Sequence, residues 1–409
     1  MAFRRAAASL HRADFEHHAR GIARLNHGSF GSSPLSVQRI EQEFRSRWRA
    51  NPDAQYFGAT LDDGLKAAAA AAAQRMGASG GADAISLVEN ATVATATIAR
   101  RWERLLREDG GGGGIMLLSC CYRAVEYSLR AICEPAGGVV HLCPVPFPGT
   151  TVDSVLGSLE ATLRTVRPRF ALLDHVASQP SVLLPIREAV ELCWRHGVEE
   201  VAVDGAHALG QVPELNVDAI GASFYYTNLH KWAFAASPAC AVHCASPDLD
   251  ASTRHVVPSW HAGGGLGRES RWVGTRDYAG SLAVPAALQY LDDWRSADGL
   301  GAVEYNAQGW RDAAASLCEA WEVELPMANE VSAPAMGMLR LPRRLDLSAD
   351  APGQPSAGVR AALRERYGIE AAVGGFGEDG GFVRLSHAVY NVDEDFDRLR
   401  DAVLEMCDG

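Results

Sequence analysis

Lys231 is the residue of this chain whose type and setting most clearly indicate chemistry. The 409 residues include 38 lysines and arginines, but only Lys66 and Lys231 are lysine. Arginine stays protonated in proteins and cannot act as a nucleophilic amine, whereas lysine can. A lysine kept in so lysine-poor a chain therefore indicates a chemical role at Lys231. Lys66 lies in an alanine-rich stretch and is typical of an exposed helix residue.

Polar residues surround Lys231 and follow two other hydrophobic segments. The three segments are ENAT (89–92), VAVDGAH (201–207) and YTNLHKW (226–232). An acid such as Asp204 at a strand end could hold a metal, a ribose hydroxyl or a protonated ring nitrogen. Backbone N–H groups at a helix start near Thr92 attract phosphate, although an ordinary helix N-cap would look the same. A surface salt bridge is the alternative interpretation of Lys231.

The hydrophobic pattern predicts alternating strands and helices that position these segments. Strands are expected at 85–88, 115–119, 139–145, 170–174, 201–203 and 223–226, with helices at 93–107, 125–133, 155–165 and 187–196. Strands separated by helices of this length indicate an α/β fold, with a mostly parallel central sheet and helices on both faces. Such sheets bind ligands at the carboxyl ends of their strands, where all three polar segments fall.

The pattern changes after about residue 285. A loop is expected at 346–358, helices at 286–294, 359–367 and up to about 406, and strands at 369–373 and 382–386. This mixture indicates a smaller α+β domain. We therefore expect an N-terminal helical segment (1–49) that packs with the small domain, a large domain (50–285) and a small C-terminal domain (286–409).

Composition excludes several classes of partner. The formal net charge of −12 argues against nucleic acid, which needs a basic face. No apolar run reaches the roughly 18 residues that cross a bilayer, so no membrane partner is expected. The nine cysteines lack CxxC or zinc-type spacing, and we expect no metal. The first ten residues resemble the start of a transit peptide, but Glu16 follows closely, so we predict a cytoplasmic location.

The joint order of the motifs resembles one family. ENAT, DGAH (204–207) and NLHKW (228–232) resemble class-V aminotransferases, which are fold-type-I enzymes dependent on pyridoxal 5′-phosphate (PLP). Within them the chain resembles the branch of isopenicillin N epimerase, cysteine desulfhydrases and the C–S lyases of ergothioneine synthesis. Further hallmarks are LNHGSFG (25–31), DHVAS (174–178), WVGTRD (272–277) and RLS (384–386). The resemblance spans about residues 25–405 and implies the PLP-dependent transferase fold type I.

The resemblance implies PLP as the cofactor and assigns residues to it. Lys231 forms the Schiff base, Asp204 pairs with the pyridinium nitrogen and His207 lies beside the ring hydroxyl, and these three are the predicted catalytic residues. The other cofactor-binding residues are implied to be Ala91, Thr92, Asn228 and His230 at the phosphate, Tyr122 stacked on the ring, and Thr275. Because Thr275 is implied to reach the phosphate of a neighbouring subunit, a homodimer is expected.

The resemblance also implies a small amino-acid substrate. Arg384 is implied to bind its carboxylate through a bidentate fork, with Asn26 and His27 beside it. A negative Asp204 would keep the ring nitrogen protonated, so that the ring accepts electrons released at Cα. We expect crowding by His230 and a dry site to lower the pKa of Lys231, which then takes the Cα proton.

Three reactions share this Cα carbanion, so the cofactor residues alone leave them open. We favour β-elimination at a C–S bond of a cysteine-like amino acid. The alternatives are epimerisation of the isopenicillin N epimerase type, transamination, and a PLP-binding protein that has lost catalysis. Persulfide-forming desulfurases of this class carry a reactive cysteine shortly before the arginine motif. No cysteine lies between Cys318 and Cys407, which argues against that chemistry here.

Overall fold

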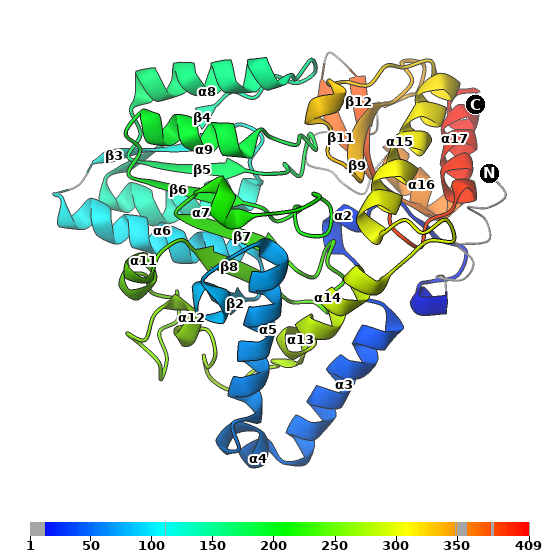
Figure 1. Cartoon of the computed structure of the whole chain (residues 1–409). Helices are drawn as coiled ribbons and strands as arrows, with labels where there is room; N and C mark the ends of the chain where they lie inside the picture. Colours follow the sequence, from blue (N-terminus) through cyan, green and yellow to red (C-terminus); the bar gives the residue numbers. More distant parts are fainter. Residues whose placement is uncertain (1–12, 111, 348, 350–357, 378–379, 409) are drawn as a thin grey trace.

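Seven strands form the central sheet of the computed structural model, which describes residues 13–110, 112–347, 349, 358–377 and 380–408 (Figure 1). The strand order is β2-β8-β7-β6-β5-β3-β4. Pairing from β7 through β4 is parallel throughout, whereas β8 runs antiparallel to both of its neighbours. The bounds are β2 (Ile85–Val88), β3 (Gly113–Leu118), β4 (Gly138–Cys143), β5 (Phe170–Asp174), β6 (Glu200–Asp204), β7 (Phe224–Asn228) and β8 (Cys240–Cys244).

Both faces of this sheet are covered, because successive side chains of each buried strand enter different hydrophobic cores. On β5, Leu172 packs in the core shared with α6 and α7, and Leu173 packs in the core shared with α5, α8 and α9. The predicted mostly parallel sheet with helices on both faces is confirmed. The helix bounds are α5 (Thr60–Met76), α6 (Ala91–Glu108), α7 (Arg123–Cys133), α8 (Val152–Val166) and α9 (Ile186–Arg195).

The sheet topology brings the carboxyl ends of four strands to one edge. Since β2 and β7 both run antiparallel to β8, β2 points the same way as β5, β6 and β7. The residues that end or follow these strands are Glu89, Asp174, Asp204 and Asn228. The functional side chains predicted from three separate segments therefore meet at this edge.

A second, antiparallel sheet of order β11-β12-β9 forms the centre of the small domain. It packs with three helices around a core that includes Trp310, Leu363, Leu385 and Leu399. The bounds are β9 (Met336–Arg340), β11 (Ala372–Gly377), β12 (Gly380–Ser386), α15 (Ala302–Trp321), α16 (Gly358–Tyr367) and α17 (Asp393–Asp408). The α+β character was expected, but β9 and the 20-residue α15 were not predicted.

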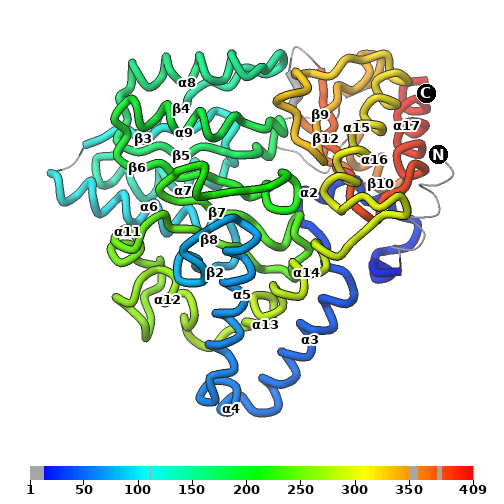
Figure 2. The backbone as a smooth tube through the Cα atoms, viewed as in Figure 1, coloured from blue at the N-terminus to red at the C-terminus, as the bar shows by residue number. Residues whose placement is uncertain are grey.

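The N-terminal segment contacts both parts of the molecule. Strand β1 (Ala23–Arg24) pairs in parallel with β10 (Ile369–Glu370), and α2 (His27–Phe30) packs against β12. Helix α3 (Leu35–Ala50) instead packs on α13 (Ala279–Leu282) and α14 (Val284–Asp293). Figure 2 shows this blue segment running from the small sheet to the base of α5. The domain boundaries at residues 49 and 285 stay predictions.

The remaining helices are short. They are α4 (Pro52–Phe57), α10 (Val217–Ile220), α11 (Pro247–Ser252) and α12 (Leu266–Glu269). None of the helices in the described ranges combines the length and the apolar character that crossing a membrane requires. The first ten residues and most of the predicted 346–358 loop lie outside the described residues.

Candidate active site

A cavity of about 160 Å³ opens at the carboxyl ends of the parallel strands. Its lining includes seven of the predicted site residues: Ala91, Thr92, Tyr122, Asp204, His207, Asn228 and Lys231. It also includes Ser29, Asn90, Val125, Asp174, Val176, Ser178 and Ala206. The five predicted residues outside this lining are Asn26, His27, His230, Thr275 and Arg384.

Lys231 lies in the loop after β7 with its amine inside the site. Its Nζ is 3.1 Å from Nε2 of His207. Burial lowers the pKa of Lys231 to about 8; the negative charge of Asp204 opposes this shift, and the positive charge of Arg384 adds to it. The dry site therefore lowers this pKa as expected, whereas His230 is not among the causes and the neighbouring charges are those of Asp204 and Arg384. A lysine with such a pKa supplies a free amine near neutral pH.

His207 is buried and neutral. Burial, with the charge of Lys231, lowers the pKa of His207 well below its usual value. The indole N–H of Trp232 points at Nδ1 of His207 at 3.4 Å, which favours the tautomer with its proton on Nε2. His207 therefore presents an N–H towards the lysine amine and adds no second positive charge to the site.

Two carboxyls lie side by side at the sheet edge. Asp174 on β5 pairs in register with Asp204 on β6, so both side chains leave the same face. Burial raises the pKa of both carboxyls, and the charge of Asp204 raises that of Asp174 further. Asp204 accepts hydrogen bonds from the Ala206 N–H at 2.9 Å and from Tyr226, whereas Oδ2 of Asp174 has no partner among the described residues. Asp204 is therefore the carboxyl of the pair that ionises more readily, and Asp174 the one that holds its proton to higher pH.

The start of α6 offers donors on one side of the cavity. The side chain of Asn90 caps the helix by accepting from the N–H of Val93 at 3.1 Å. The N–H of Ala91 donates to Oδ1 of Asn228 at 2.9 Å. This N–H is therefore already used, and the bond fixes the connection between β2 and α6 to the end of β7. Thr92, at the second position of the helix, keeps its N–H and hydroxyl without a partner in the described part of the chain. His230 is not in the cavity lining, and its Nδ1 lies 2.7 Å from the carbonyl oxygen of Ala239.

Arg384 is a buried cation whose partners among the described residues are all neutral. Nη1 donates to the carbonyl and hydroxyl oxygens of Ser178, at 3.1 and 2.8 Å. Nη2 donates to Oδ1 of Asn26 at 2.8 Å and to the hydroxyl of Ser29 at 2.5 Å. Nε has no partner, and among the described residues every hydrogen bond of Arg384 goes to a neutral oxygen atom. Burial lowers the pKa of Arg384 to about 10. A negatively charged ligand would remove this electrostatic cost.

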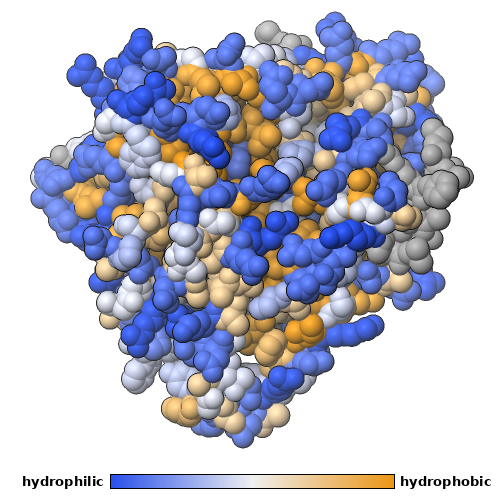
Figure 3. All heavy atoms as spheres, in the orientation of Figure 1, coloured by the Kyte–Doolittle hydropathy of each residue, from blue (hydrophilic) through white to orange (hydrophobic). Residues whose placement is uncertain are grey.

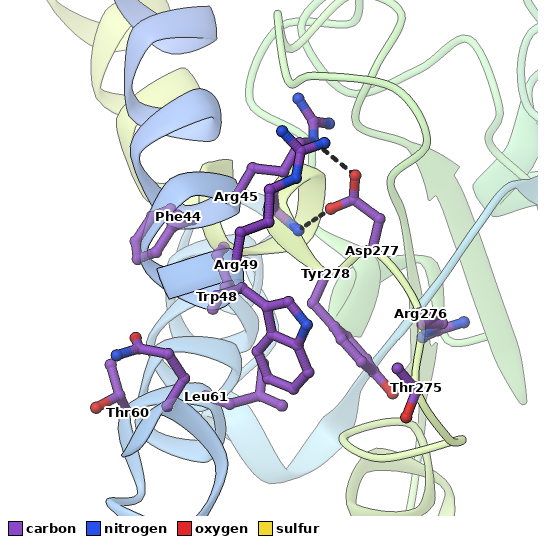
Figure 4. A pocket seen from close by; sticks show the side chains of 13 residues that line it. Phe44, Arg45, Trp48, Arg49, Thr60, Leu61, Thr275, Arg276, Asp277 and Tyr278 are labelled. Atoms are coloured by element: carbon purple, nitrogen blue, oxygen red, sulfur yellow. Dashed lines mark hydrogen bonds and ion pairs between the residues drawn. The ribbon is translucent and has the colours of Figure 1, made fainter. Parts of the chain in front are cut away.

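Two further predicted residues lie away from the cavity. His27 contacts the main-chain oxygen of Lys231 and the hydroxyl of Tyr390, not the pocket. Thr275 is exposed and lines a different cavity of about 230 Å³ (Figure 4). That cavity shares no lining residue with the Lys231 pocket, and Arg45 donates to Asp277 at 2.6 Å on its wall. Hydrophobic residues reach the surface around it, where α3 and α13 meet (Figure 3).

Sequence reasoning assigned no role to Asp174, Ser178 or Ser29, although all three line the pocket. Asp174 and Ser178 belong to the DHVAS segment that carried part of the resemblance. The available signal was that Asp174 and Asp204 both end buried hydrophobic segments of a parallel sheet. Ser29 gave no such signal, since its contact with Arg384 joins residues 355 positions apart.

The residues at this site fit PLP. A free amine at Lys231, a charged carboxylate at Asp204 and spare donors at Thr92 are the groups that an aldehyde, a protonated ring nitrogen and a phosphate require. The Nε–H of Arg384, which has no partner among the described residues, can donate a hydrogen bond to a carboxylate oxygen. Lys231, Asp204 and Thr92 line the same cavity, so one molecule can meet all three.

Solved structures with the same fold include a cysteine desulfurase of Escherichia coli and the cystine C–S lyase C-DES with cysteine persulfide. The first has a TM-score of 0.72 and 17% identity, and covers 98% of both chains. The second has a TM-score of 0.72 and 18% identity, and covers 95% of this chain and 98% of that one. The fold is therefore fold type I of the PLP-dependent enzymes, as expected.

Sequence comparison gives a narrower result, although no protein-family model matches. The L-cysteine desulfhydrase of Arabidopsis thaliana is 33% identical over 418 residues, covering 96% of this chain and 89% of the relative. The isopenicillin N epimerase of Streptomyces clavuligerus is 30% identical over 255 residues, covering 58% and 60%. The chain belongs to the L-cysteine desulfhydrase family, and the resemblance inferred from the motifs is confirmed.

Proposed function

We propose that this protein is a PLP-dependent carbon–sulfur lyase that cleaves L-cysteine or a close analogue by β-elimination. With water, L-cysteine then gives pyruvate, ammonia and hydrogen sulfide. The observation that carries the proposal is a buried Arg384 with no acidic partner in the described part of the chain, near a Lys231 whose pKa is about 8. This pair suits a substrate with a carboxylate and an acidic Cα–H, and membership of the desulfhydrase family selects cysteine.

Each side chain has a physical task in this proposal. Bound PLP supplies the electron sink that makes a Cα proton removable. Arg384 holds the carboxylate and fixes which Cα bond faces Lys231. Nζ of Lys231 then takes the Cα proton as a general base. The Nε2–H of His207, 3.1 Å from Nζ, orients that amine without charging it.

The cofactor contacts are part of the same proposal. Asp204, ionised beside a protonated Asp174, balances a positive ring nitrogen. Thr92 at the start of α6 binds the phosphate, with Ala91 and Asn228 fixing the loop beneath it. Tyr122 has an exposed side chain on the cavity rim and covers the ring face. His230 contributes indirectly, because its bond to Ala239 holds the Lys231 loop.

The thiols support release of sulfide over its transfer to the protein. Cys120 and Cys121 lie next to Tyr122, and burial raises the pKa of both. Thiols that stay protonated are poor sulfur acceptors. Cys318 and Cys407 are partly buried and pack against the small-domain core. No cysteine of the described residues lines the Lys231 cavity, so we propose that the sulfur leaves as sulfide.

We also propose a cytoplasmic homodimer. Thr275 is exposed and separate from the Lys231 cavity of its own chain, which is the arrangement needed for a contact with a partner's phosphate. Large exposed side chains at Phe57 (79%) and Trp260 (84%) offer apolar surface for association. Sedimentation of the holoenzyme tests this proposal, and a monomer at micromolar concentration would contradict it.

A product assay tests the activity. Purified holoenzyme is incubated with L-cysteine and S-substituted cysteines without a keto acid, and pyruvate, ammonia and sulfide are measured. We expect catalytic pyruvate formation that is lost in Lys231→Ala. An absence of pyruvate, while amino acids still change the cofactor spectrum, would refute the lyase. Racemised amino acid or a dependence on keto acid would then identify an epimerase or an aminotransferase.

A further inference from the structure

His27 contacts the main chain of Lys231 but does not line the cavity into which the lysine amine points. Its Nε2 lies 3.0 Å from the carbonyl oxygen of Lys231, and its Nδ1 lies 2.9 Å from the hydroxyl of Tyr390. The ring is 1% exposed and packs 4.8 Å from the ring of Trp232. Both polar atoms of a buried side chain are thus committed to specific partners, one of them the lysine backbone.

The protonation state of His27 fits these partners. Burial lowers the pKa of His27 to about 3, so the ring is neutral and has one donor and one acceptor. A carbonyl oxygen can only accept, which places the proton on Nε2. The Tyr390 hydroxyl then donates to Nδ1. The order Tyr390, His27, Lys231 is therefore a directed chain of two hydrogen bonds.

The residues on either side of His27 contact the substrate-binding arginine. Asn26 and Ser29 both accept from Nη2 of Arg384. Gly31, at the end of the same turn, lies so close to the lysine loop that an added Cβ would be 1.9 Å from the His230 carbonyl oxygen. Its φ of +70° also favours glycine. The turn 26–31 therefore touches Arg384 at one end and the Lys231 backbone at the other.

We propose that the 26–31 turn couples Arg384 to Lys231, with His27 as the positioning residue that fixes the lysine main chain. When a carboxylate takes Arg384 away from Asn26 and Ser29, the turn is freed to adjust, and His27 carries that adjustment to the lysine. This inference rests on the proposed function for the identity of the carboxylate. It assigns His27 to the lysine and not to the substrate.

The test uses the holoenzyme in four variants. His27→Ala removes both bonds, His27→Gln keeps an N–H donor for the Lys231 carbonyl, and Tyr390→Phe removes only the hydroxyl. The control is His243→Ala, which deletes another buried histidine (3% exposed) on β8, paired with Asp218 and outside the cavity lining. The readouts are kcat and KM for L-cysteine, the melting temperature, and the rate at which apoenzyme recombines with PLP.

We expect His27→Ala to lower kcat by about 10-fold to 100-fold, the range that a small misplacement of a reacting group produces. KM should change less than about threefold, recombination with PLP should slow, and His27→Gln should recover most of the loss. Tyr390→Phe should show the same pattern more weakly, and His243→Ala should lower only the melting temperature. If His27→Ala does not fold, the Gln and Phe variants decide the outcome.

Two results would overturn the inference. An increase in KM with kcat unchanged would mean that His27 serves substrate binding. Equal loss of melting temperature and no kinetic change in His27→Ala and His243→Ala would mean a structural role alone. The recombination rate needs no C–S lyase activity, so it reports on His27 even if the proposed reaction proves wrong.

Discussion

Replacing Arg384 by alanine tests the central step of substrate recognition. Four of the five guanidinium N–H groups donate to Ser178, Asn26 and Ser29, and only the Nε–H lacks a partner. An arriving carboxylate replaces Asn26 and Ser29 at Nη2 and also accepts from the free Nε–H, so its net gain is one hydrogen bond to a charged donor, worth about 1.5–3 kcal/mol. At about 1.4 kcal/mol per tenfold, Arg384→Ala should lower kcat/KM for L-cysteine by about 10-fold to 140-fold.

The assay compares L-cysteine with its methyl ester, which lacks the negative carboxylate. Wild-type enzyme should prefer the free acid, and that preference should fall towards unity in Arg384→Ala. Arg340→Ala is the matched control, because Arg340 pairs in register with Phe382 on the adjacent strand and lies 5.2 Å from that ring. It should change kcat/KM less than about twofold. If Arg384→Ala keeps the full preference for the free acid, then Arg384 does not bind the substrate carboxylate.

Three further predictions concern the site charges and the core. Because the pKa of Lys231 is lowered to about 8, recombination of apoenzyme with PLP should speed up with rising pH and level off above about pH 8; a rise continuing towards pH 10.5 would contradict this. The charge of Asp204 raises that pKa, so Asp204→Asn should move the inflection to lower pH, whereas Asp174→Asn should leave it in place; equal shifts would mean that Asp174 is ionised. Trp102 is fully buried, stacks on Phe170 and donates a hydrogen bond to Glu200. Trp102→Ala should therefore lower the free energy of unfolding by about 3–5 kcal/mol, measured by calorimetry. An unchanged melting temperature would show that Trp102 does not stabilise the core in this way.

The central sheet could be predicted because its strands are short hydrophobic runs between helices of clear period. The segments at 85–88 and 170–174 match β2 and β5 residue for residue. Strand β8, Cys-Ala-Val-His-Cys, contains a single β-branched residue and an ionisable histidine, so its local signal was weak. Its five residues are nonetheless buried, because it is inserted between β2 and β7. Tertiary context made it a strand.

The candidate site was predictable to the extent that parallel strands end at one edge. This rule brought Lys231, Asp204, His207 and Asn228 into one cavity. It could not give contacts between distant segments, such as Asn26 with Arg384, which are 358 positions apart. Nor could it give side-chain directions outside the strands, so it could not show that His230 in its loop and His27 on α2 stay outside the cavity lining.

The pairing of β1 with β10 has a consequence for how the protein is made. Residues 23–24 find their partner only at 369–370, near the far end of the chain. During synthesis the large sheet can assemble as it leaves the ribosome, but the turn beside Lys231 must wait for the last segments to emerge. A nascent chain that stops short of β12 would carry its lysine in an unfinished pocket. Activity would therefore begin only after the segment through β12 has emerged and folded.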